Sequence, residues 1–129
     1  MQGPPQTFEQ DVQSNKGMAI LAYIIFFVPL IAGTHKTSPY VKFHTNQGTV
    51  LAIFSFACSI VLGIISGILT AILTASFALG ALAAVLGLFS LLWFAYGIFV
   101  FVLVIMGIVN ASGGKMKPLP LIGKYTIIK

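Results

Sequence analysis

The chain has 129 residues, of which 58% are hydrophobic and only 7% are charged, whereas a soluble domain carries about 25% charged residues. This composition excludes an ordinary soluble domain and predicts an all-α integral membrane protein. The net charge of +5 comes from seven lysines and no arginine, which argues against nucleic-acid recognition. Cys58 is the only cysteine, so an intrachain disulfide and a cysteine-based metal cluster are excluded.

The polar N-terminal segment, residues 1–14, carries the only two acids, Glu9 and Asp11. Its composition predicts a flexible tail. It lacks the basic region of a signal peptide, so the following apolar run, residues 18–33, is expected to be retained. That run is somewhat shorter than the roughly 20 residues of a full span. With Ser14 or Asn15 as a cap it predicts a first transmembrane helix over residues 15–33, which Pro29 should kink near its end.

A polar segment, residues 38–48, separates this run from a much longer one. It should begin a helix, because Ser38 is a good N-cap and a proline follows it. The second transmembrane helix is therefore entered through an amphipathic turn. Two alternatives stand for this turn. Its polar residues face lipid headgroups while its aromatic residues anchor at the interface, or His44, Asn46 and Gln47 form a polar cluster with partners elsewhere in the chain.

The long apolar run, residues 49–109, contains no charged residue and no histidine. A turn near residues 75–81 would divide it into helices over 39–74 and 77–110. The predicted domain, residues 15–112, then has three spans. This arrangement gathers six of the seven lysines on one side and predicts a multi-pass protein of the inner or plasma membrane, with the N-terminus outside and the C-terminus cytoplasmic.

Four spans are the alternative, with a second break near Ser90. Trp93 and Tyr96 favour it, because interfacial aromatic residues would otherwise fall near the middle of a helix. Small residues recur along both long helices and let helices approach closely. They would pack within this chain or against another chain, and both interpretations stand. These predicted packing residues are Ser59, Gly63, Gly67, Gly80, Ala84 and Gly87.

The C-terminal tail, residues 113–129, is basic and contains Pro118 and Pro120, which force an extended path. It is too apolar for a free tail. We expect it to return along the membrane surface with its lysines among anionic headgroups. If it lies on the same side as the turn at His44–Gln47, it can dock against that turn.

Two motifs carry a family resemblance, an aromatic-His-x-x-Gln turn and a Lys-x-Leu-Pro-x-x-Gly tail. From about Lys16 onward the chain resembles a family of small prokaryotic membrane proteins of unknown function, which is distantly similar to the Tic-twenty component of the chloroplast inner-envelope import machinery. The resemblance implies an all-helical membrane domain and no established activity. The residues of the predicted interaction motif are Phe43, His44, Asn46, Gln47, Lys117, Leu119, Pro120 and Gly123.

The sequence predicts a non-enzymatic accessory or scaffold subunit, because His35 and His44 have no carboxylate near them in sequence. No catalytic residue, cofactor or metal site is predicted. The expected partners are the lipid bilayer, with anionic lipids at the lysine-rich face, and other membrane subunits or further copies of this chain. The alternative is a component of a protein-translocation or pore-forming assembly, which follows from the distant import-machinery resemblance.

Overall fold

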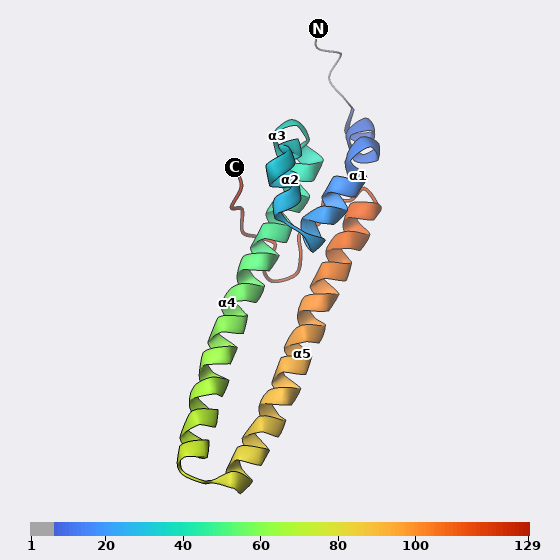
Figure 1. Ribbon diagram of the computed structural model, residues 1–129. Helices are drawn as coiled ribbons and strands as arrows, with labels where there is room; N and C mark the ends of the chain where they lie inside the picture. The colour runs from blue at the N-terminus through green and yellow to red at the C-terminus, as the bar shows by residue number, and fades with distance from the viewer. Residues whose placement is uncertain (1–6) are drawn as a thin grey trace. The chain divides into compact units, whose positions relative to one another are not determined.

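The structure is a computed structural model that describes residues 7–129, and every regular element in that range is a helix (Figure 1). The chain divides into two compact units. We call them the terminal unit (Met1–Ile53 with Val102–Lys129) and the hairpin unit (Phe54–Phe101). The helices are α1 (Phe8–Ile24), α2 (Phe27–Ala32), α3 (Thr34–Thr37), α4 (Pro39–Ala75) and α5 (Leu79–Ser112).

Helix α1 begins earlier than the sequence suggests. The expected flexible tail covers residues 1–14, but the chain is helical from Phe8, and residues 1–6 lie outside the described range. A capping box explains the early start: the Gln10 backbone N–H donates to Thr7 Oγ1 at 3.3 Å, and the Thr7 N–H donates to Gln10 Oε1 at 3.0 Å. Acidic residues in the first turn add a favourable interaction with the helix dipole.

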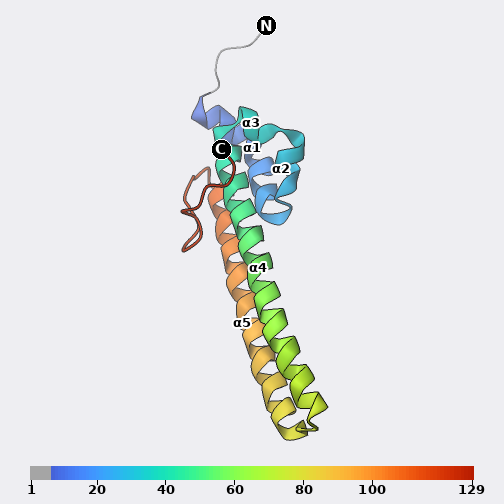
Figure 2. The ribbon, with the colours of Figure 1, turned by 90° about the vertical axis from the view of Figure 1, so that its left-hand side faces the viewer.

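The first apolar run does not form one helix over residues 15–33. It breaks at Ile25 and Phe26, and α2 turns back beside α1 (Figures 1 and 2). The break is not at Pro29, which occupies the third position of α2. A proline is tolerated there because the first N–H groups of a helix have no intrahelical acceptor. Gly33, with φ at 74°, ends α2 in the left-handed conformation.

Helices α4 and α5 are the two elements long and apolar enough to cross a membrane within residues 7–129. They end at Ala75 and Ser112, one and two residues beyond the expected ends, and residues 76–78 connect them. Helix α5 continues without a break through Ser90, whose hydroxyl donates to Leu86 O at 2.7 Å. Few of the side chains in their apolar windows are buried within the chain, as is expected of lipid-facing side chains.

The buried core lies in the terminal unit, where α1 packs against the first turns of α4 and the last turns of α5. Two glycines permit this packing. A Cβ atom built on Gly48 would lie 1.8 Å from Ala22 O, and one built on Gly107 would lie 2.3 Å from the Tyr23 ring. At Gly48 the backbones of α1 and α4 therefore approach more closely than any side chain would allow, and at Gly107 the Tyr23 ring takes the place of a side chain.

Candidate functional site

The C-terminal tail is held against α4 by the amide side chain of Gln47. Gln47 Oε1 accepts from the Leu119 N–H at 2.8 Å, and Gln47 Nε2 donates to Gly123 O at 2.9 Å. The tail closes its own turn here, because the Gly123 N–H donates to Leu119 O at 2.9 Å. Gly123 is required at this point, since a Cβ atom would lie 2.4 Å from the Leu119 backbone and 2.7 Å from Gln47 Oε1.

Asn46 holds a later part of the tail. Its Oδ1 atom accepts from the backbone N–H groups of Ile127 and Ile128, at 2.7 and 3.1 Å. Asn46 is 7% exposed and Gln47 is 2% exposed, so both side chains are withdrawn from solvent, and the Asn46 oxygen and both polar atoms of Gln47 bond to tail backbone. Two adjacent residues of α4 thus fix two separate segments of the tail.

His44 joins three parts of the terminal unit and is completely buried. Its Nδ1 atom lies 2.7 Å from Tyr23 Oη on α1, and its Nε2 atom lies 2.8 Å from Lys115 O at the start of the tail. A carbonyl oxygen only accepts, so Nε2 carries the hydrogen and Nδ1 accepts from the tyrosine hydroxyl. Both nitrogen atoms of the imidazole therefore have partners within the chain.

Asp11 caps the start of α4 from α1. Asp11 Oδ1 accepts from Ser38 Oγ at 2.5 Å and from Asn15 Nδ2 at 2.8 Å, and Asp11 Oδ2 accepts from the Tyr40 N–H at 3.3 Å. Ser38 Oγ in turn accepts from the Val41 N–H at 3.0 Å. The carboxylate lies at the positive end of the α4 dipole, which stabilises it there.

Of the two alternatives for the turn at residues 38–48, the structure has the polar cluster. Phe43 is half-buried with its ring edge-on to His44 at 5.1 Å, and Leu119 is buried. Lys117 and Pro120 of the predicted motif are exposed. Sequence reasoning missed four residues of this cluster. Asp11 falls in the segment predicted to be a tail, and nothing in the spacing singles out the others, which are Tyr23, Gly48 and Gly107.

The predicted packing residues all lie in the hairpin unit, and most of them are open, unlike the two glycines of the terminal unit. Built Cβ atoms on Gly63, Gly67, Gly80 and Gly87 would meet nothing within 4 Å, and Ala84 is exposed. Ser59 makes an interhelical hydrogen bond, with its Oγ atom 2.9 Å from Tyr96 Oη.

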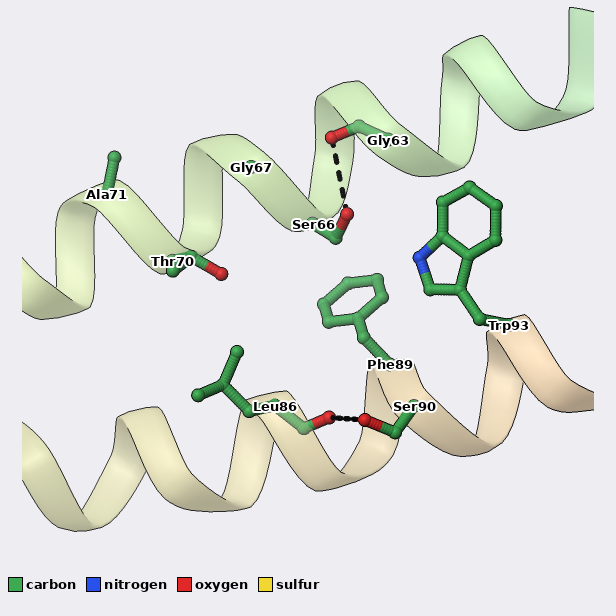
Figure 3. Close-up of a pocket in the computed structure, with 9 residues that line it drawn as sticks. All are labelled: Gly63, Ser66, Gly67, Thr70, Ala71, Leu86, Phe89, Ser90 and Trp93. Carbon is green, nitrogen blue, oxygen red and sulfur yellow. Dashed lines mark hydrogen bonds between the residues drawn. The ribbon is translucent and has the colours of Figure 1, made fainter.

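An open groove of about 450 Å³ lies between α4 and α5 within this unit (Figure 3). Gly63, Ser66 and Gly67 line one wall, and Phe89 and Trp93 line the other. In Figure 3 the two aromatic rings point into the groove from α5, toward the glycine-bearing face of α4. The small residues therefore leave space here rather than fill it.

Residues 7–129 hold no group of three histidine, cysteine or acidic side chains placed to bind a metal ion. What the terminal unit provides instead is a set of polar side chains that bind backbone groups of the same chain.

The magnetosome magnetite crystal formation protein family matches residues 14–126. The chain belongs to this family. The matched range includes the aromatic-His-x-x-Gln motif of the turn and the Lys-x-Leu-Pro-x-x-Gly motif of the tail. Membership in this magnetosome family, together with two long apolar helices, makes the chain a membrane protein. Neither the curated proteins nor the solved structures include a match to it. The expected likeness to the Tic-twenty component is not found by these comparisons and stays a prediction.

Proposed function

We propose that this chain is a non-enzymatic accessory or scaffold subunit of a magnetosome-type membrane, where it assists crystal formation by organising other membrane proteins. The observation that carries the proposal is the use of the polar side chains in the terminal unit. His44, Asn46, Gln47 and Asp11 each bind groups of the same chain. A catalytic group needs a free lone pair or proton facing a substrate, and these side chains are already occupied.

The small number of carboxylates supports a scaffold role more than a mineral-binding role. Hard metal ions are held by oxygen ligands, above all Asp and Glu. The chain has two acidic residues, and Asp11 is buried and bonded. Glu9 is then the one acidic side chain left exposed. We therefore propose that the effect on crystal formation runs through partner proteins.

The partner surface in this proposal is the membrane-embedded face of the hairpin unit. The glycines at 63 and 67 are open, with the groove of Figure 3 beside them. Small-residue rows that stay unfilled within one chain are suited to the backbone of a neighbouring helix. Of the two interpretations of these rows, the open glycines support contact with another chain.

Contacts inside the terminal unit also support a revised topology. Asp11, near the start of α1, bonds to Ser38 at the start of α4, and the Tyr40 hydroxyl donates to Ala111 O at the end of α5. These three helix ends therefore lie together. We propose two crossings, by α4 and α5, with α1 and α2 dipping into the membrane from the side that holds the start of α1 and the C-terminal tail. The three-span arrangement, with the N-terminus outside, is the competing prediction.

The test uses the full-length tagged protein in a host that forms magnetosomes and lacks its own copy. Wild-type protein should restore normal crystals and co-purify with larger membrane proteins in mild detergent. Gly67→Leu, which fills the open face, should be stable yet restore crystals poorly and lose its partners. Leu88→Ala, on an exposed part of α5 outside the groove, is the matched control and should behave like wild type.

A wild-type protein that purifies without partners, in cells whose crystals do not depend on it, would refute the proposal. The translocation alternative needs ionisable or polar residues lining a path, and α4 and α5 beyond residue 48 contain none that is charged. It remains the weaker candidate.

A further inference from the structure

A second feature of the terminal unit lies outside the polar cluster. It is a cavity of about 530 Å³ lined by His35, Lys36, Thr37, Pro39, Lys42 and Lys129. This volume is within the range of about 300–1,000 Å³ typical of ligand sites. Three of the chain's seven lysines meet here, although they are up to 93 positions apart in sequence.

Each lysine is brought to the cavity by a defined piece of structure. Lys36 lies on α3, which follows the left-handed turn at Gly33. Lys42 is in the first turns of α4. Lys129 follows the two residues whose N–H groups bind Asn46. The bonds from Asn46 to the tail therefore do more than hold the tail in place, because they also position Lys129 beside Lys36 and Lys42.

None of the six lining side chains is acidic. Asp11 caps the same end of α4, but its oxygen atoms accept from Ser38, Asn15 and Tyr40. The N-terminal N–H groups of α4 are occupied by the same cap, so the helix end itself does not supply the site. With three lysines and no acidic side chain, the side-chain lining of the cavity is positive, which favours an anion there.

We propose that this cavity binds the phosphate of an anionic phospholipid headgroup. The site lies at the end of a membrane-crossing helix, where headgroups are found. Lysine binds phosphate as a point charge, without the bidentate fork of arginine. The site therefore selects for negative charge at the membrane surface. This proposal requires only that the terminal unit lies at that surface, and it does not depend on a role in crystal formation.

The test compares two triple variants that remove equal charge. The first, Lys36→Gln/Lys42→Gln/Lys129→Gln, empties the cavity of its lysines. The second, Lys115→Gln/Lys117→Gln/Lys124→Gln, removes three exposed lysines elsewhere in the terminal unit. Binding of phosphatidylglycerol and of zwitterionic phosphatidylcholine to the full chain is titrated in a neutral detergent and read by native mass spectrometry.

A juxtamembrane lysine contributes roughly fivefold to binding of anionic lipid. We expect the wild type to prefer phosphatidylglycerol, and the cavity variant to bind it at least about tenfold more weakly than the control variant does. Equal losses in both variants, or no preference over phosphatidylcholine, would overturn the site. A second arm titrates inorganic phosphate. Binding of phosphate without binding of phosphatidylglycerol would overturn the assignment to lipid.

Discussion

The packing of α1 against α4 depends on Gly48, and replacing this glycine is the most direct test of the terminal unit. In Gly48→Ala the new Cβ atom would lie 1.8 Å from Ala22 O and 2.7 Å from the Ala22 carbonyl carbon. Both atoms belong to helix backbone and cannot rotate away. Ordinary contacts begin near 3.4 Å, so α1 must shift outward by roughly 1.5 Å.

Two effects of opposite sign set the magnitude. Overpacking a close contact costs about 1–3 kcal/mol and sometimes more, and the rigid neighbour places this site at the upper end. Alanine gains about 1 kcal/mol over glycine inside a helix. The net expected loss is therefore about 2 kcal/mol, which corresponds to a fall in melting temperature on the order of 5–10 °C.

The measurement is recovery of folded protein by size exclusion after heating in mild detergent. Gly63→Ala is the matched control, because it lies on the same helix and its new Cβ atom meets nothing within 4 Å. It should be as stable as wild type or slightly more so. If both variants melt at the same temperature, α1 does not pack against α4 at Gly48 and the description of the terminal unit is wrong.

Three further changes test the polar cluster. Gln47→Leu removes both bonds to the tail, so trypsin should cut after Lys124 faster than in wild type; unchanged protection would argue against the anchor. Tyr23→Phe leaves the buried Nδ1 of His44 without its donor and should cost about 1–3 kcal/mol in a thermal melt, whereas an unaltered melt would mean the bond is not made. Asp11→Asn weakens the cap of α4 and should cost about 1 kcal/mol, measured in the same way, and no loss would place Asp11 in solvent.

The long helices could be read from the sequence because composition alone determines them. Sixty-one residues without a charge must be helical in a bilayer, and the polar residues near Ser76 mark the one turn. The fold-back between α1 and α2 could not be predicted in this way. An apolar run of that length has the same composition whether it crosses the membrane or folds back at Phe26.

The glycines also show that contacts between elements could not be predicted from the sequence. The spacing of Gly63 and Gly67 predicts close helix packing, yet both are open, while Gly48 and Gly107 are the ones in contact. Spacing shows where a backbone can be approached, but it does not show which element approaches it. Asn46 and Gln47 predict a polar cluster, but the sequence does not identify their partners, which are backbone groups of the tail.

The central claim is the proposal that the terminal unit holds α1 and the C-terminal tail on one side of the membrane. It is tested with single cysteines at Gln13, Ser76 and Thr126, all exposed, in a Cys58→Ser background. An impermeant thiol reagent is applied to sealed vesicles of known orientation. We expect Gln13 and Thr126 to react from the same side and Ser76 from the opposite side. Reaction of Gln13 and Thr126 from opposite sides would contradict the account and restore the three-span topology.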